Sequence, residues 1–357
     1  MGNEIKLLDT TLRDGSYAIN FQFSCLDLEL IVTELEEIGF EYIEIGHGVG
    51  LGASMKGHGR ALQTDEEYLS TAQRCINKSK FGMFCIPGVA ELDDINLANK
   101  YHMSFVRVGT NVEDVERSEP FIKKAKACGM MVMANYMKSY AAGPQEFAEK
   151  VKLSQKYGAD VIYIVDSAGG MFPEDIKKYY DAIREYSDID IGFHAHNNLG
   201  LAVSNSIYAA ELGIKYIDCS LQGLGRSAGN AITELLALSL NKKGYEIGID
   251  AKKTLYAGKK LIKPLLKNVG INPLDVVCGI AEFHTSYMKS IHKISTMFKV
   301  NPLDLIIEYS KVDKVNMDEN RLKEIAVKLP EDFVSISEYN FADYIGNEQI
   351  ECNSIKK

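Results

Sequence analysis

The sequence lacks the features that mark membrane, secreted and nucleic-acid-binding proteins. It contains no apolar run close to the roughly 18–20 residues that a transmembrane helix requires. The N-terminal residues lead directly into an apolar strand pattern, without the hydrophobic core of a signal peptide. A net charge of −9 over 357 residues leaves no basic excess for a polyanion. We therefore expect no binding to nucleic acid or to a membrane.

Cysteine spacing also excludes a class of folds. The chain has seven cysteines, and no two of them form a CxxC pair; they stand at positions 25, 75, 85, 128, 219, 278 and 352. Scattered thiols are typical of a reducing compartment rather than of a disulfide framework. We therefore expect a cytoplasmic protein, and its 46% hydrophobic and 25% charged residues are ordinary for a soluble globular chain.

The sequence does contain a regular alternation of short apolar segments with longer amphipathic ones. The pattern predicts strands at residues 5–8, 42–45, 81–85, 105–108, 130–136, 160–165, 190–195 and 216–220. It predicts helices at residues 26–38, 65–76, 91–98, 119–127, 144–157, 173–185, 202–212 and 228–240. Eight such units match an α/β fold of the (β/α)₈ TIM-barrel type, whose usual size is about 250 residues. An open doubly wound sheet is the alternative, but no glycine-rich turn follows the first strand.

The pattern of the remaining residues differs from the strand–helix alternation and predicts a C-terminal part outside the barrel. We expect a TIM-barrel catalytic domain at residues 1–245 and a mostly helical C-terminal extension or small domain at residues 246–357. Residues 252–267 and 302–310 are amphipathic with helical spacing, whereas the last forty residues lose this periodicity. The pattern leaves open whether this part covers the barrel mouth or forms a separate domain.

Polar residues concentrate where the predicted strands end, and the carboxyl ends of barrel strands are where active sites lie. His194 and His196 end the seventh strand and project to the same side, because side chains alternate along a strand. Two such imidazoles can share one metal ion, although a His-x-His pair alone equally fits two ordinary histidines. With a carboxylate and an amide oxygen from other strand ends, the set favours Mn²⁺, Mg²⁺ or Co²⁺ over structural zinc. The glycine-rich loop 223–230 alone is compatible with a phosphate cradle or a plain turn.

Three motifs together resemble one family. The run Leu8-Asp9-Thr10-Thr11-Leu12-Arg13-Asp14-Gly15, the strand end at 194–197 and the loop at 225–230 are similar to those of the DRE-TIM metallolyases, the 3-hydroxy-3-methylglutaryl-CoA lyase-like family. Within it, residues 44–51 and 165–171 resemble the 4-hydroxy-2-oxovalerate aldolase branch most. The resemblance covers roughly residues 5–295.

The resemblance implies a metal site and substrate contacts. Its expected ligands of a divalent metal, with Mn²⁺ favoured, are Asp14, His194, His196 and Asn230. Arg13 would hold the enolate oxygen of the substrate, and Ser167 would help to hold the pyruvate carboxylate. Asp9 would either orient Arg13 or cap a turn. His47 would be either a substrate contact or a solvated loop histidine.

One pair of catalytic residues departs from the family pattern. The aldolases carry a histidine three residues after the ligand aspartate, where this chain has Tyr17. They carry a tyrosine after the barrel, where our alignment places His284, although a shifted alignment would bring Tyr287 to that place. The two residue types are therefore expected to be exchanged, with their proton-transfer roles traded. A histidine, with a pKa near 6.5, suits removal of a hydroxyl proton at neutral pH.

The resemblance implies a metal-dependent class II-type aldolase, a carbon–carbon lyase that acts next to a 2-oxo acid. A Claisen-type synthase joining an acyl-CoA to a 2-oxo acid is the first alternative, and a non-catalytic barrel that serves as a scaffold or partner subunit is the second. The expected partners are a small 2-oxo acid, further copies of the chain in a homo-oligomer, and an aldehyde dehydrogenase docked on the C-terminal part.

Overall fold

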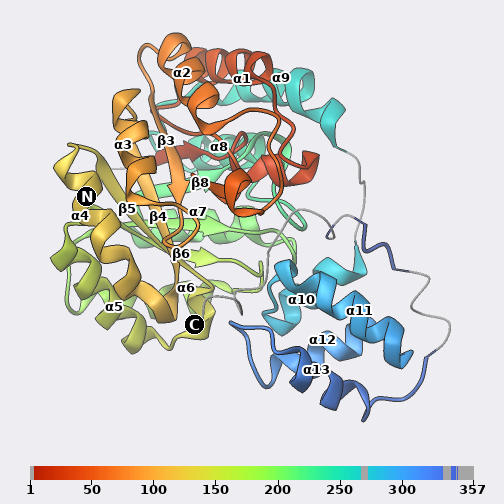
Figure 1. The fold of residues 1–357 in the computed structure, drawn as a ribbon. Helices are drawn as coiled ribbons and strands as arrows, with labels where there is room; N and C mark the ends of the chain where they lie inside the picture. The colour runs from red at the N-terminus through yellow and green to blue at the C-terminus, as the bar shows by residue number, and fades with distance from the viewer. Residues whose placement is uncertain (1–3, 267–271, 333–338, 343, 345–357) are drawn as a thin grey trace.

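The computed structural model describes residues 4–266, 272–332, 339–342 and 344. Eight parallel strands pair in sequence order and close into a barrel, as Figure 1 shows. The strands are β1 (Lys6–Asp9), β2 (Tyr42–Glu44), β3 (Lys80–Cys85), β4 (Phe105–Asn111), β5 (Met131–Met137), β6 (Val161–Asp166), β7 (Asp190–Ala195) and β8 (Tyr216–Cys219). Their residues are almost all buried, because the helices cover the outer side of a parallel sheet. The prediction of a TIM barrel is confirmed.

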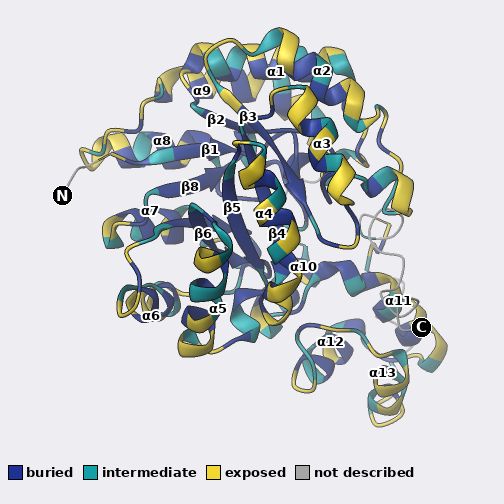
Figure 2. Cartoon of the chain, turned by 60° about the vertical axis from the view of Figure 1, so that its left-hand side comes forward, coloured by how far each residue is buried: buried dark blue, intermediate teal, exposed yellow. Residues whose placement is uncertain are grey.

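Eight helices surround the barrel, with buried inner faces and exposed outer faces (Figure 2). They are α1 (Cys25–Ile38), α2 (Asp65–Cys75), α3 (Leu92–Lys100), α4 (Glu119–Ala127), α5 (Pro144–Tyr157), α6 (Pro173–Arg184), α7 (Ala202–Leu212) and α8 (Thr233–Lys242). Local signals set their ends: Ser24 and Thr64 accept the N3 backbone N–H in capping boxes. Gly39 ends α1 with φ 110°, a conformation that favours glycine. Most predicted bounds therefore agree with the structure to within one or two residues.

The largest disagreement in the barrel is the start of α8. The sequence predicts a helix from residue 228, but α8 begins at Thr233. Residues 230 and 232 run extended instead, because Asn230 forms a β-bridge with His196 and Ile232 forms one with Ser220. These backbone pairings tie the loop after β8 to the end of β7. The loop is thereby held across the barrel mouth, where the histidine pair lies.

The C-terminal part is helical, as predicted. It contains α9 (Ala251–Ala257), α10 (Pro273–Ala281), α11 (Met288–Phe298), α12 (Pro302–Ser310) and α13 (Glu319–Ala326). The sequence analysis predicted helical segments only where α9 and α12 lie; it missed α10 and α11, and also α13, which lies in the stretch where the periodicity is weak. Of the predicted helix at 252–267, only the part up to Ala257 is α-helical; a π-helical turn (Gly258–Ile262) and a 3₁₀ turn (Lys263–Leu265) follow, and residue 267 lies outside the described residues. A Cβ at Gly258 would lie 1.7 Å from Glu234 Oε1.

The hydrophobic core of the barrel extends past residue 245 along the chain. The barrel's hydrophobic cluster includes Ile247, Ala257 and Ile262. A second cluster starts at Leu274 and includes the buried faces of α10 to α13. The boundary between residues 245 and 246 stays a prediction, and the packing argues for a change of core between Ile262 and Leu274.

Helix α10 contacts the loops that follow the carboxyl ends of the strands. Asp275 of α10 accepts hydrogen bonds from Ser227 in the loop after β8 (2.6 Å) and, through its carbonyl, from Asn198 after β7 (2.9 Å). Gly170 after β6 approaches Gly279 of α10 so closely that a Cβ would lie 2.2 Å from the Gly279 oxygen. In Figure 1, α10 to α13 form a separate blue layer beside the barrel, whereas α9 lies next to α1. Within the described part of the chain, no helix has both the length and the apolar character needed to span a bilayer.

Candidate active site

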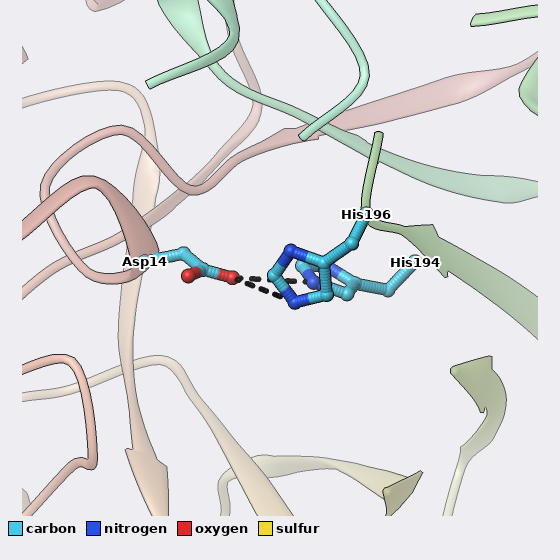
Figure 3. A group of neighbouring side chains, drawn as sticks. All are labelled: Asp14, His194 and His196. Carbon is cyan, nitrogen blue, oxygen red and sulfur yellow. Dashed lines mark ion pairs between the residues drawn. The ribbon is translucent and has the colours of Figure 1, made fainter. Parts of the chain in front are cut away.

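Three side chains from distant parts of the sequence meet at the barrel mouth. Asp14 lies in a 3₁₀ turn after β1, while His194 and His196 lie at the end of β7 and just beyond it. Asp14 Oδ2 is 3.2 Å from His194 Nε2 and 3.9 Å from His196 Nε2, and Figure 3 shows all three side chains pointing toward one another. One ligand atom from each lies within 4.8 Å of the others, and each residue is buried. Asp14, His194 and His196 therefore form a candidate metal site.

The outer nitrogen of each imidazole is held by a protein acceptor. His194 Nδ1 lies 2.8 Å from Asp218 Oδ2 of β8, and His196 Nδ1 lies 3.3 Å from the carbonyl oxygen of Gly229. Metal-binding histidines are usually oriented in this way, with the second nitrogen bonded to a carboxylate or a carbonyl. The two Nε2 atoms are thereby directed at the same point as the Asp14 carboxylate.

The charges around the cluster favour ionised Asp14 and neutral His196, the protonation states that can bind a metal. Burial opposes ionisation of Asp14, yet Arg13 and the two imidazoles hold the pKa of Asp14 well below its usual range. Burial and the charge of Arg226 hold the pKa of His196 well below its usual range. Burial also opposes the charged form of His194, but Asp14 and Asp218 raise its pKa. A cation bound here would compete with a proton for His194, since a metal ligand must be deprotonated.

Asn230 gives an independent observation on metal binding. Its Nδ2 is 3.4 Å from Thr10 Oγ1, whereas its buried Oδ1 has no hydrogen-bond partner among the described residues. An unpaired buried amide oxygen is costly and therefore rare. Gly225 allows the loop to close on this side chain, because a Cβ there would lie 2.6 Å from Asn230 Nδ2. The orphan oxygen, together with the mixed N/O donor set, fits a divalent cation.

Arg13 is buried beside the cluster and is held by two carboxylates. Its Nη1 lies 3.3 Å from Asp14 Oδ2, and its Nε donates to Glu44 Oε2 of β2 at 2.8 Å. The ring of Phe84 lies under the guanidinium at 4.9 Å. Asp9 does not orient Arg13: its two oxygens accept from the N–H and the hydroxyl of Thr11, so it caps the turn after β1. Glu44 is the residue that orients Arg13.

The sequence analysis missed a buried ionic network inside the barrel. Arg107 of β4 donates to Glu44 Oε2 at 2.7 Å, to Asn135 Oδ1 at 3.0 Å and to Asp218 Oδ2 at 2.5 Å. It links the residue that orients Arg13 to the residue that orients His194. The signal was present in the sequence, because Glu44, Arg107 and Asp218 are single charges within otherwise apolar strands. Charges of this kind are almost never fully buried unless they are paired.

The loops after β5, β6 and β8 bring two further cations to the site. Arg226 donates through Nη2 to the Ser167 carbonyl at 2.9 Å and lies 3.1 Å from His196 Nε2. The Ser167 hydroxyl, expected to contact a carboxylate, accepts the backbone N–H of Lys138 at 2.9 Å. Lys138 Nζ donates to the Tyr287 hydroxyl at 2.7 Å. The sequence analysis assigned no role to Arg226 or Lys138.

His284 lies on the C-terminal segment between α10 and α11, within electrostatic reach of the cluster. Burial, followed by the charges of Arg226, Lys138 and His196, holds the pKa of His284 well below its usual range, so the ring is neutral. Its Nδ1 contacts the Ser286 hydroxyl at 2.6 Å, which leaves Nε2 for a substrate.

Tyr17 and His47 pack together in the loops after β1 and β2. The Tyr17 ring contacts Phe21 edge-on at 5.1 Å and lies against Gly48. His47 stacks on Phe21 at 3.8 Å; its Nδ1 accepts the Val49 N–H, and its Nε2 lies 3.1 Å from the Gly59 carbonyl. Burial lowers the pKa of His47 to about 4, so this histidine is neutral and not solvated. Both ring nitrogens thus support the loop, and a substrate contact for His47 stays a prediction that these bonds disfavour.

The sequence also matches known proteins over most of its length. The family model for HMGL-like proteins matches residues 4–261. The chain belongs to the HMGL-like family. This HMGL-like chain is 36% identical over 330 residues to the 4-hydroxy-2-oxovalerate aldolase of Carboxydothermus hydrogenoformans, covering 92% of this chain and 98% of that protein. It is also 36% identical over 326 residues to the enzyme of the same name from Moorella thermoacetica, covering 91% and 96%.

Among solved structures, this HMGL-like chain is similar in fold to the HMG-CoA lyase from Brucella melitensis. The TM-score is 0.65 at 18% sequence identity, and the match covers 74% of this chain and 99% of the lyase. This likeness shows the shared barrel. The family resemblance inferred from the motifs is therefore confirmed.

Proposed function

We propose that the protein is a divalent-metal-dependent aldolase that releases pyruvate from 4-hydroxy-2-oxo acids, or forms them in the reverse direction. The observation that carries this proposal is the buried Asp14–His194–His196 group with the Arg13 guanidinium 3.3 Å from Asp14. Two curated relatives that share this chain over more than 90% of its length carry the name 4-hydroxy-2-oxovalerate aldolase.

The metal would be held by Asp14, His194, His196 and the unpaired oxygen of Asn230. Mn²⁺ is the cation we favour for this donor set, with Mg²⁺ and Co²⁺ as alternatives. When bound, the cation would supply Lewis-acid polarisation of the oxygens of a 2-oxo acid.

Arg13 and Ser167 would bind the pyruvate half of the substrate. In the cleavage direction the C3–C4 bond breaks, the C4 hydroxyl loses its proton and becomes an aldehyde, and the bonding pair moves toward the C2 oxygen. Arg13 donates to Glu44, which fixes its orientation, and its charge would stabilise that oxygen as it becomes negative. Ser167 would donate its hydroxyl to the carboxylate. Protonation at C3 then completes pyruvate.

His284 would take the proton from the C4 hydroxyl. The ring is neutral, and a neutral imidazole can accept a proton at its unprotonated nitrogen. Nδ1 is engaged with Ser286, so Nε2 is the nitrogen left for the substrate; it accepts the proton in the tautomer in which Nδ1 carries the ring hydrogen and donates it to the Ser286 hydroxyl. Tyr17 would return a proton to the pyruvate fragment, which is the traded role that the sequence suggests. Tyr287 is the alternative to His284, but its hydroxyl is engaged by Lys138.

The test is pyruvate release from a panel of 4-hydroxy-2-oxo acids in the presence of Mn²⁺. We expect turnover by the wild type, and a loss of about 10²- to 10⁴-fold in kcat for His284→Asn, the range typical of a removed general base. Asp14→Asn should lose Mn²⁺ binding and turnover together, whereas the distant surface variant Asp160→Asn should retain both. Absence of turnover across the panel would refute the proposal, and release of a CoA thiol from acetyl-CoA plus a 2-oxo acid would identify the Claisen-type alternative.

The association partners stay predictions. The C-terminal helices α10 to α13 are the surface that we propose for an aldehyde dehydrogenase partner, and a homo-oligomer is expected. Co-purification and sedimentation of the full chain would test both.

A further inference from the structure

The turn after β5 contains a half-buried tyrosine whose buried hydroxyl is not used by the protein. Tyr140 lies in the short 3₁₀ turn after β5. Its hydroxyl oxygen is closed to solvent and has no hydrogen-bond partner among the described residues. Tyrosine hydroxyls usually find a partner when they are buried, and an unmade bond carries the full cost of desolvation. An unpaired buried hydroxyl in an active site is therefore a candidate ligand-binding group.

Arg226 acts on the same region. Its guanidinium is buried and lies against the cluster, 3.1 Å from His196 Nε2. It also donates to the Ser167 carbonyl at 2.9 Å and to the Thr285 hydroxyl, next to His284. Tyr140 stands two residues after Lys138, whose backbone N–H donates to the Ser167 hydroxyl at 2.9 Å, so the turn that carries Tyr140 and the Arg226 guanidinium both contact Ser167. Arg226 thus lies between the metal site and the segment that carries His284.

The two arginines of the site are held by different parts of the chain. Arg13 is fixed by Glu44 on the β2 side, and the proposed function uses it for the pyruvate half. Arg226 is fixed from the other side, by Thr285 of the C-terminal segment. If His284 takes the C4 proton, the half of the substrate beyond C4 would lie on the His284 side, where Arg226 contacts Thr285. A guanidinium and a phenol hydroxyl are both donors, and together they suit an anionic oxygen.

We infer that Arg226 and Tyr140 bind a second carboxylate, carried on the aldehyde half of the substrate. The substrate class is then a 4-hydroxy-2-oxo diacid, and the second product is a 2-oxo acid aldehyde of the glyoxylate type rather than a simple aliphatic aldehyde. This inference rests on the proposed function, since it extends the same site.

Binding of two stable analogues tests the inference without turnover. 2-Oxoglutarate and 2-oxovalerate have the same carbon chain and differ only in a terminal carboxylate or methyl group. In calorimetric titrations of the Mn²⁺-loaded protein, we expect 2-oxoglutarate to bind at least 10-fold more tightly. Arg226→Gln and Tyr140→Phe should each reduce this ratio, by about 10- to 100-fold for a hydrogen bond to a charged group. Arg74→Gln and Tyr186→Phe, at exposed positions far from the site, are the matched controls.

Tyr140→Phe tests the inference even if Arg226→Gln folds poorly. It removes only a hydroxyl that has no partner among the described residues, so its melting temperature should equal or exceed that of the wild type. Equal binding of the two analogues by the wild type, or an equal loss for both in the variants, would overturn the inference. Kinetics separate it from the proposed function: pyruvate release from 4-hydroxy-2-oxovalerate but no preference for 4-hydroxy-2-oxoglutarate refutes the inference alone. Release from neither acid refutes the proposed function.

Discussion

Replacing Asp218 by asparagine should weaken metal binding although Asp218 is not itself a ligand. One of its oxygens, Oδ2, accepts from His194 Nδ1 at 2.8 Å and from Arg107 at 2.5 Å. The Asp218 charge orients the His194 imidazole and makes it more basic. Asp218→Asn removes this charge. Loss of such a partner typically costs 10- to 100-fold in metal affinity, or about 1.4–2.7 kcal/mol.

The same substitution also has a cost in folding. Removing one partner of a buried ion pair typically costs about 3–5 kcal/mol, because the other charge is left uncompensated. Arg107 keeps Glu44 and Asn135, so we expect the lower end of that range. The assay is a Mn²⁺ titration in competition with a chelator, next to urea unfolding of the metal-free protein. Asp160→Asn, at a half-exposed pair with Lys126, is the control. A folded Asp218→Asn variant with wild-type Mn²⁺ affinity would refute the reasoning.

Three further predictions concern other parts of the site. Burial raises the pKa of Asp9 to about 7 from 3.8, so between these values the folded state keeps a proton that the unfolded chain releases. The free energy of unfolding should therefore fall as pH rises from 4 to 7, by up to about 1.4 kcal/mol per pH unit from this group. In Asp9→Asn this dependence on pH should be weaker. If urea unfolding gave the two proteins the same dependence of unfolding free energy on pH, the prediction would be contradicted. Gly170→Ala, whose Cβ would lie 2.2 Å from the Gly279 oxygen, should displace α10 at a cost of about 1–3 kcal/mol and lower turnover while the far-UV spectrum is kept. Gly143→Ala, with open space around its Cβ, should do neither. Asn230→Ala should reduce the rise in melting temperature that saturating Mn²⁺ produces, and an undiminished rise would exclude Asn230 as a ligand.

The barrel and the histidine pair were predictable because each depends on a local signal, whereas Asp14 was assigned as a ligand only through the family resemblance. Strand and helix periods, caps such as Ser24 and the alternation of His194 and His196 are all expressed within a few neighbouring residues. The start of α8 at Thr233 was not predictable, because pairing of Asn230 with His196 overrides the local helical pattern. The role of Asp9 was ambiguous for the same reason. Only the closed barrel shows that the partner of Arg13 is Glu44, which lies 31 residues away along the chain.

The groups that surround the triad were harder to predict, because their meaning depends on the fold. Arg107 contacts Glu44 and Asp218, which are 63 and 111 residues away along the chain. A charge within an apolar strand signals that something unusual is buried there, but it does not show which partner compensates it. Arg226 was part of a quoted motif, yet only the C-terminal segment that contacts it gives it a place in the site.

The balance of charge at the barrel mouth connects the metal to the choice of substrate. Glu44, Asp14 and Asp218 face Arg13 and Arg107 in one buried network, so three carboxylates meet two guanidinium groups. The third carboxylate charge favours a proton on His194, which lies between Asp14 and Asp218 and whose pKa they raise, or a metal cation in its place. A divalent ion would give the network a net positive charge, and Arg226 adds a further positive charge beside it. A 2-oxo acid should therefore bind the metal-loaded protein far more tightly than the metal-free protein, since burying an anion requires a compensating charge.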